Sequence, residues 1–245
     1  MNTLLIETAT QICSVVLSAD GRILARRDSD VPNAHSTRLS VFIDEVLKES
    51  GLTPRDLGAV GVSAGPGSYT GLRIGVSTAK GFCYALGIPL VSVPTLLSMA
   101  ALYYRQHPDY KGLVCPMIDA RRMECYTMVV DDRLRILRDT HADIFDRPHP
   151  ELQSPIVGFL DEQETVFIGD GAAKTREVFA SHANARFDSD FRLSAEGLVD
   201  LVAQKIAAGQ TEDVAYFEPF YLKDFVAKKS VVHGLREKNE NNAQD

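Results

Sequence analysis

Short apolar runs alternate with helix-spaced apolar positions along the first hundred residues. Runs rich in Ile, Val and Leu predict five strands, at 3–8, 12–18, 22–28, 59–63 and 88–93. Helical spacing predicts three helices, the first from Ser36 to Gly51, the second from near Thr70 to Leu86, and the third from Leu96 to Tyr104. Three consecutive strands therefore come first, and helices and strands alternate after them.

The same order of elements returns after a break at 108–112. Further strands are predicted at 113–118, 123–130, 134–137 and 166–168, and further helices at 172–180 and 196–207. Two pairs of matching residues are separated by the same 112 positions, Glu7 with Asp119 and Cys13 with Cys125. We therefore predict an ancient duplication, with one half at 1–107 and the other at 108–210.

The last residues follow neither pattern. Residues 214–223 are aromatic and too apolar for a free linker, so we expect a return segment over 211–235 that packs back on the body. Residues 236–245 are polar and low in apolar residues, and we expect a mobile tail there.

Four glycines lie within eleven residues between the predicted strand at 59–63 and the helix after it. The first part of this stretch, the loop Gly65-Pro66-Gly67-Ser68, gives the backbone room for positive φ and for a close approach. Its spacing matches neither a P-loop nor a dinucleotide-binding loop, so neither phosphate-binding mechanism is indicated.

Gly71, Gly75 and Ala79 recur every four residues and form one row along the second helix. A row almost without side chains lets another backbone approach closely, which offsets the cost of glycine inside a helix, roughly 1 kcal/mol against alanine. Either the chain's own sheet or a partner can supply that backbone. Three small residues exceed what one helix–sheet crossing usually needs, so we expect a groove that faces a partner.

Composition limits the function classes. With 33 acidic against 26 basic side chains the net charge is −7, which argues against tight nucleic-acid binding by the chain alone. No apolar run is long enough to span a membrane, and the N-terminus lacks the basic region of a signal peptide. Four cysteines without C-x-x-C spacing are typical of free thiols, so we expect a cytoplasmic protein.

Catalytic motifs receive little support. The six histidines show no pair at i, i+3 or i, i+4, so no metal site is indicated. Residues 61–65 fit G-x-S-x-G around Ser63, but Pro66 and Gly67 separate that serine from the helix, which argues against a nucleophile elbow. Glu7 and Asp119 could form a paired-carboxylate site, although duplication alone also places acids at equivalent strand ends.

A duplicated unit that opens with three meandering strands resembles the actin–hexokinase–Hsp70 superfamily. The resemblance implies an α/β fold of two similar ribonuclease-H-like halves. In that superfamily the first hairpin of each half carries an acid and a glycine, and its backbone holds nucleotide phosphates. The corresponding hairpins here, Glu7–Gln11 and Asp119–Met123, contain no glycine, which disfavours an ATPase or sugar kinase.

The stretch Gly65–Gly75, GPGSYTGLRIG, closely resembles the signature of the TsaB (YeaZ) family of bacterial tRNA threonylcarbamoyladenosine biosynthesis proteins. Shorter stretches agree with this family from residue 4 to about 225. They are Leu5–Thr10, His35-Ser36, Ile118–Tyr126, Gly169–Ala172 and Glu218–Leu222. One departure is Glu7, where the family commonly has aspartate.

The resemblance implies a non-catalytic partner of TsaD, the paralogue that carries a metal-binding histidine pair. TsaD transfers threonylcarbamoyl to the adenosine beside the anticodon of tRNA. The resemblance further implies a heterodimer with TsaD, a ternary complex with the P-loop ATPase TsaE, tRNA contact only through that complex, and a homodimer when the chain is alone. No catalytic residue, metal or cofactor of its own is expected, although a nucleotide could lie at the interface with TsaD.

The resemblance places the TsaD interface on the helices that begin near Ser36 and Thr70. The expected contacts, beside the signature loop Gly65-Pro66-Gly67-Ser68, are Ser36, Leu39, Phe42, Tyr69, Thr70, Gly71, Leu72, Arg73, Gly75 and Ala79. If the small-residue row faces the chain's own sheet, Tyr69 and Arg73 become the main contacts, since tyrosine and arginine are enriched among interface hot spots. The alternative function is an enzyme in its own right, a metallopeptidase-like hydrolase or an actin-like phosphotransferase.

Overall fold

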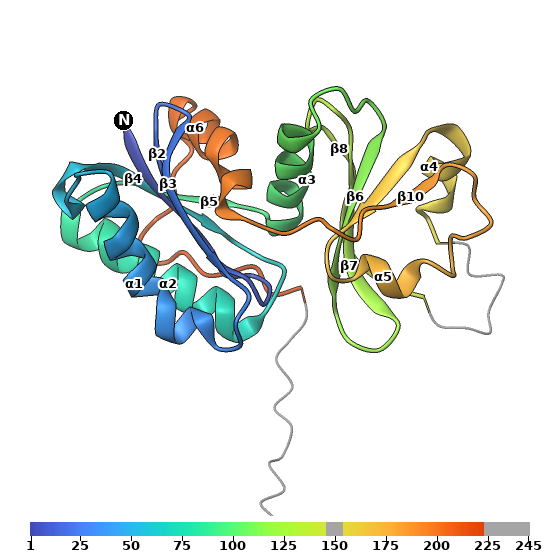
Figure 1. The fold of residues 1–245 in the computed structure, drawn as a ribbon, viewed down its shortest axis with the longest axis horizontal. Helices are drawn as coiled ribbons and strands as arrows, with labels where there is room; N and C mark the ends of the chain where they lie inside the picture. The colour runs from blue at the N-terminus through green and yellow to red at the C-terminus, as the bar shows by residue number, and fades with distance from the viewer. Residues whose placement is uncertain (146–153, 223–245) are drawn as a thin grey trace, which may run out of the picture.

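Two five-stranded sheets lie side by side in the computed structural model, which describes residues 1–145 and 154–222 (Figure 1). The first sheet has the strand order β3-β2-β1-β4-β5, and the second has β8-β7-β6-β9-β10. In both, the first three strands of the half are antiparallel, and the last two run parallel to the first. The predicted duplicated α/β fold with ribonuclease-H-like halves is confirmed.

Turn residues set the limits of the elements in the first half. Asp20 and Gly21 both take positive φ between β2 and β3, and Gly87 (φ 66°) ends α2 in the left-handed region. The elements are β1 (Asn2–Glu7), β2 (Cys13–Ala19), β3 (Arg22–Ser29), α1 (Ala34–Glu49), η1 (Pro54–Asp56), β4 (Leu57–Ser63), α2 (Tyr69–Leu86), β5 (Leu90–Val93) and α3 (Thr95–Gln106).

Two helices begin one or two residues earlier than predicted. Helix α1 begins at Ala34, because Asn33 takes a left-handed conformation (φ 63°), and the hydroxyl of Ser36 donates back to the Asn33 carbonyl. Helix α3 begins at Thr95 itself, after Pro94. The Thr95 hydroxyl accepts the amide of Gly65 at 3.0 Å and thus joins α3 to the signature loop.

The second half has shorter helices. Its elements are β6 (Leu113–Asp119), β7 (Glu124–Val130), β8 (Ile136–Ile144), α4 (Val157–Glu162), β9 (Thr165–Ile168), α5 (Ala172–Thr175), β10 (Ala185–Phe187), η2 (Ala195–Leu198) and α6 (Val199–Ala207). Sequence patterns did not indicate α4 and β10, and they predicted a longer α5, which ends at Thr175 because hydrogen bonds to the third preceding residue replace the helical pattern.

Strand β8 lies later than predicted. Asp131 accepts the amides of Arg133 and Arg135 with one carboxylate oxygen, which holds residues 131–135 in a loop. Leu134 has a positive φ of 58° within that loop and cannot continue a strand. The strand therefore begins at Ile136 instead of Leu134.

The two halves exchange their last helices. Helix α3, at the end of the first half, packs Leu96, Met99 and Leu102 into one core cluster with strands β6, β7 and β9 of the second. Helix α6 and the turn before it pack on β1, β2 and β5 of the first half, through residues such as Leu198 and Val202. Figure 1 shows α6 over the first sheet and α3 beside the second. The division at residue 107 is thus a division of the sequence and not of the hydrophobic cores.

The return segment lies on the first half as far as the structure describes it. Glu212 forms an antiparallel bridge with Leu90 on the edge of the first sheet. Val214 and Phe217 pack against the core that α1 and α2 cover. The remainder of the predicted segment, 223–235, and the predicted tail, 236–245, lie outside the described residues.

Candidate partner-docking surface

The signature loop joins the β1–β2 hairpin, helix α2 and the return segment. Ser68 caps α2, because its hydroxyl accepts the amide of Gly71 at 3.2 Å. The amide of Ser68 donates to the carbonyl of Ala9 in the hairpin at 2.6 Å. The amide of Phe220 donates to the carbonyl of Ala64 at 2.7 Å, which holds the return segment at the same place. The loop therefore has a clear structural role within this chain.

The small-residue row of α2 faces that hairpin. A Cβ on Gly71 would overlap the carbonyl oxygen of Thr8, and a Cβ on Gly75 would overlap the Thr8 hydroxyl. Ala79, the third member, is fully buried in the core beneath α2. The expectation that this row forms a partner-facing groove is therefore wrong, because the chain's own hairpin occupies the space.

Three further predicted contacts are also buried within the chain. Leu39, Phe42 and Leu72 are 3%, 7% and 0% exposed. Leu39 and Phe42 form the apolar stripe with which the amphipathic α1 covers the sheet. These three residues cannot touch a partner directly, and their assignment to the interface is wrong for that reason.

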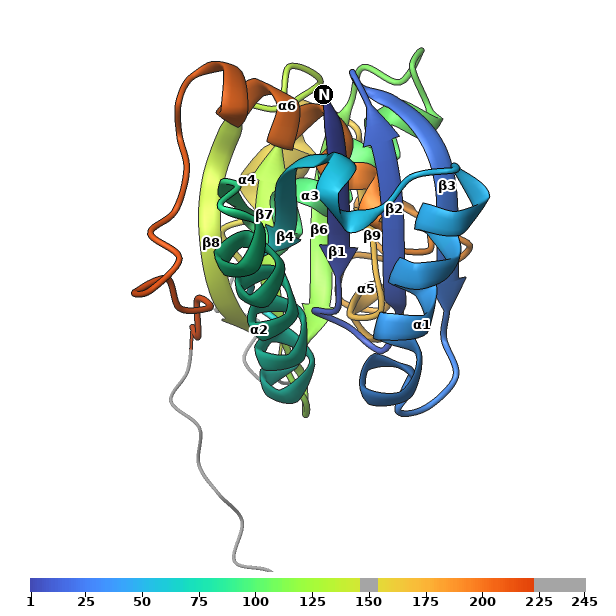
Figure 2. The same ribbon diagram turned by 90° about the vertical axis from the view of Figure 1, so that its left-hand side faces the viewer.

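The other predicted contacts remain accessible. Helices α1 and α2 lie side by side at the end of the first half (Figure 2). Ser36, Thr70 and Arg73 are exposed on them. Tyr69 is partly exposed, and its ring lies 4.9 Å from that of Tyr221 in the return segment. The Arg73 guanidinium donates to the Tyr69 hydroxyl at 3.1 Å, so arginine and tyrosine form one unit at the start of α2.

A second row of small residues lies on the outward face of α2. Ser77, Gly81 and Ala85 are exposed and follow one another at four-residue spacing after Arg73. A Cβ added to Gly81 would meet no atom within 4 Å. Nothing within the described part of the chain therefore requires glycine there. The four-residue spacing could have revealed this row in the sequence, but it does not tell which of the two rows faces outward.

Aromatic residues lie near this outward row. Tyr84, one helical turn after Lys80, is 86% exposed, and Tyr216 of the return segment is 84% exposed. The Lys80 ammonium donates to the carbonyls on both sides of Tyr216, those of Ala215 at 3.2 Å and Phe217 at 3.0 Å. The return segment thereby extends the exposed face of α2.

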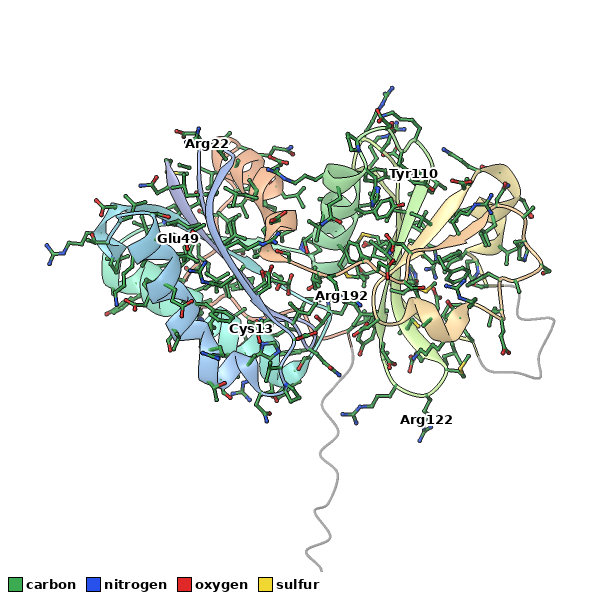
Figure 3. All side chains as sticks on the ribbon, viewed as in Figure 1. Cys13, Arg22, Glu49, Tyr110, Arg122 and Arg192 are labelled. Carbon is green, nitrogen blue, oxygen red and sulfur yellow. The ribbon has the colours of Figure 1, made fainter. Side chains whose placement is uncertain are left out.

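The cleft between the halves has unfavourable chemistry for a nucleotide. A cavity of about 380 Å³ lies there, and Arg192 is labelled in this region in Figure 3. The charged side chains that line it are four carboxylates and two guanidinium groups, from Asp30, Asp119, Asp170, Asp188, Arg176 and Arg192. An excess of carboxylates repels phosphate groups, and neither hairpin offers the glycine that a phosphate-binding backbone requires.

Glu7 and Asp119, the equivalent acids of the two halves, occupy opposite environments. Glu7 is fully buried, and one carboxylate oxygen accepts the Ala9 amide and the Ser63 hydroxyl, both at 2.7 Å. Its other oxygen has no partner in the described structure, and burial raises the pKa of Glu7 to about 7. Asp119 is exposed and pairs with the ammonium of Lys174. The two acids therefore do not form one catalytic pair.

The groups required by an independent enzyme are poorly placed. Within residues 1–145 and 154–222, no group of three or more His, Cys, Asp or Glu side chains could hold a metal ion. Ser63 of the G-x-S-x-G motif is fully buried and donates to Glu7, so it cannot reach a substrate. Burial raises the pKa of the Cys13 thiol to about 11 and that of Cys125 to about 12, which keeps both thiols protonated at neutral pH.

Comparison with known proteins identifies the family. The family model for TsaD, tRNA N6-adenosine threonylcarbamoyltransferase, matches residues 29–243. The tRNA threonylcarbamoyladenosine biosynthesis protein TsaB of Escherichia coli K12 is 30% identical over 94% of this chain and 98% of its own. The chain belongs to the TsaB family.

Other TsaB proteins agree with this assignment. TsaB of Bacillus subtilis is 34% identical over 52% of this chain and 54% of its own. The solved structure of YeaZ from Pseudomonas aeruginosa has a TM-score of 0.75 and 25% identity, over 90% of this chain and 99% of that one. Another structure, of an uncharacterized Pseudomonas aeruginosa protein "with similarity to peptidase YEAZ", has a TM-score of 0.77 at 25% identity, over 91% of this chain and 99% of that one. In the described part of this TsaB-family chain, no helix has the length and apolar content needed to cross a bilayer.

Proposed function

We propose that this chain takes part in tRNA threonylcarbamoyladenosine biosynthesis as a non-catalytic subunit that binds and activates TsaD. The match to TsaB over almost the whole of both chains supports the pathway. The buried serine and protonated thiols support a role without catalysis by this chain. In the proposed complex, TsaD transfers threonylcarbamoyl to tRNA, the ATPase TsaE joins the pair, and a nucleotide could lie at the interface with TsaD.

The outward face of α1 and α2 carries this proposal. Gly81 lies in open space inside an 18-residue helix, although glycine weakens a helix by roughly 1 kcal/mol against alanine. A partner helix that packs closely over Ser77, Gly81 and Ala85 would account for the glycine. Tyr84 and the Tyr69–Arg73 pair lie on the same helix and offer the side chains that interface hot spots favour.

Substitution of Gly81 tests the docking face. Gly81→Leu is expected to keep or raise the melting temperature, because the side chain enters solvent and leucine favours helix. It should abolish co-purification with TsaD from the same genome and with it tRNA modification. The matched control is Gly158→Leu, since Gly158 of α4 is also exposed with no atom within 4 Å of a Cβ.

Three outcomes separate the alternatives. A Gly81→Leu protein that still captures TsaD as well as the Gly158→Leu control would contradict the docking face. Wild-type protein that fails to capture TsaD would contradict the proposed partnership. Peptidase or ATP-hydrolysing activity of the isolated chain, lost after removal of metal, would favour the enzyme alternative.

A further inference from the structure

The tip of the β6–β7 hairpin has an unusual backbone conformation. Arg121 and Arg122 both take positive φ, 69° and 48°. Left-handed backbone is unfavourable for residues with long side chains, and connections of this kind normally use glycine, asparagine or aspartate. Two consecutive arginines at such positions therefore carry a conformational cost. A strained position is good evidence for function when the side chain itself has a use.

The fold holds the tip in this conformation. The ammonium of Lys174 donates to the carbonyl oxygens of Arg122 and Glu124, at 2.9 and 2.5 Å, and to the carboxylate of Asp119 at 2.5 Å. The amide of Arg121 donates to the same carboxylate at 2.7 Å. Lys174 of α5 therefore satisfies two carbonyl groups of the turn, and the Asp119 carboxylate is already paired with that ammonium.

The two guanidinium groups are left for an external ligand. Arg121 and Arg122 are exposed, while the flanking Ala120 and Met123 are partly covered. Neither guanidinium has a hydrogen-bond or ion-pair partner within residues 1–145 and 154–222. Figure 3 shows Arg122 at the outer end of the hairpin, extending away from the body. The tip is therefore a small, preorganised cationic projection on a chain whose net charge is −7.

We propose that Arg121 and Arg122 bind the phosphodiester backbone of the tRNA substrate when this chain is part of the TsaD complex. The inference rests on the proposed function, which supplies the RNA. A guanidinium group can donate two parallel hydrogen bonds to two oxygens of one phosphate. Contacts with the phosphate backbone position a nucleic acid without reading its sequence. An acidic protein is a poorer fit, because protein interfaces need an apolar centre and the tip exposes only the two arginines.

The small charge of the tip agrees with the expectation that the isolated chain does not bind tRNA tightly. Two arginines can neutralise about two phosphates, which is too few for tight binding at physiological salt. The contact would add to those made by other subunits and orient the tRNA. Its effect should therefore appear in the complex and not in the chain alone.

The test compares three double variants in complexes reconstituted with TsaD and TsaE. Arg121→Asn with Arg122→Gly removes both charges and the strain, Arg121→Gln with Arg122→Gln removes the charges alone, and Arg121→Lys with Arg122→Lys keeps the charges. Binding of an unmodified tRNA transcript is measured over a range of salt concentrations. The first two variants should weaken binding and lower the slope of log affinity against log salt by about 1 for each arginine lost, whereas the lysine variant should retain most of the slope.

Stability provides an independent readout. The Asn-Gly variant should raise the melting temperature of the isolated chain, while the double glutamine variant should not. Unchanged tRNA affinity and salt slope in intact complexes of both neutral variants would overturn the inference. Loss of complex formation by these variants would also overturn it, since the tip would then contact a protein subunit. If the wild-type chain does not capture TsaD, the proposed function falls, and the inference falls with it.

Discussion

The two halves share one strand order but differ in what covers their hairpins. In the first half α1 and α2, of 16 and 18 residues, pack beside the hairpin, where Thr8 and Ala9 are fully buried. In the second half the helices at the equivalent places, α4 and α5, have six and four residues, and the hairpin tip is open. The same duplicated unit thus gives a helical surface on one side and a projecting turn on the other. Covering helices, and not strand order, decide which chemistry each half exposes.

The outer faces of the two sheets show the same contrast. Val15 lies in the core between β2 and α1. The residue 112 positions later is Thr127, whose hydroxyl donates to Asp143. Arg138 forms a largely buried ion pair with that carboxylate at 2.7 Å. Polar groups that satisfy one another therefore take the place of the apolar contacts that a long helix provides in the first half.

Loss of the ion pair between Arg138 and Asp143 should have the largest effect on stability. Arg138→Leu leaves the largely buried carboxylate of Asp143 without its cation. Removal of one partner from a buried pair typically costs about 3–5 kcal/mol, so we expect a fall of about 4 kcal/mol in the free energy of unfolding. Chemical denaturation checks this value. The double variant Arg138→Leu with Asp143→Leu should recover most of the loss, and a double variant as unstable as the single one would show that the pair is not the cause.

A large side chain in the inward small-residue row of α2 should have the next largest effect on stability. Gly75→Leu forces α2 away from Thr8, and overpacking of this kind typically costs 1–3 kcal/mol, so we expect about 3 kcal/mol of lost stability. Melting temperature and TsaD capture are measured on the same preparation. Unchanged stability would contradict the close contact between α2 and the first hairpin.

The buried acid of the first half should make stability depend on pH. Because burial raises the pKa of Glu7 from 4.5 to about 7, the folded state prefers the protonated carboxyl. The stability of the wild type should fall between pH 4.5 and 7, and Glu7→Gln should remove that fall, with a gain of up to about 3 kcal/mol at pH 8 and none at pH 4.5. Urea denaturation of both proteins at both pH values checks this, and an equal fall in Glu7→Gln would show that Glu7 is not the cause.

The smallest expected effect concerns the two exposed glycines. Gly81→Ala and Gly158→Ala should each raise stability by up to about 1 kcal/mol, since alanine favours helix and neither position is crowded. If the outward face of α2 docks TsaD, only Gly81→Ala should weaken capture. Equal capture by both variants would mean that the partner does not approach α2 at this point.

Sequence patterns predict the order of the strands along the chain because each buried strand requires a continuous apolar run. The repeat of those runs reveals the duplication. They also indicate turns whose conformation needs a special residue, such as Asp20-Gly21 and Gly87. They do not reveal which side of α2 points toward the rest of the chain, because both of its small-residue rows have four-residue spacing. Only contact with Thr8 identifies the inward row.

The backbone conformation of the β6–β7 hairpin tip could not be predicted from the sequence either. Arginine ordinarily avoids positive φ, so the residues at 121 and 122 give no local sign of their conformation, which Lys174 and Asp119 impose from outside the turn. The burial of Glu7 was hidden for a similar reason. An acid at the end of a strand is usually exposed, but this one is enclosed and lies beside Ser63 of β4 and Ser98 of α3.

The exchange of α3 and α6 between the cores has a consequence for synthesis of the chain. During translation the first sheet is complete once β5 has left the ribosome, but its inner face stays uncovered until residues 195–207 emerge, roughly a hundred positions later. Helix α3 likewise has no second sheet to pack against until β6, β7 and β9 have emerged, the last of which ends at Ile168. The nascent first half therefore cannot finish folding on its own, and a product truncated near residue 107 would expose apolar surface of the kind that chaperones and proteases recognise.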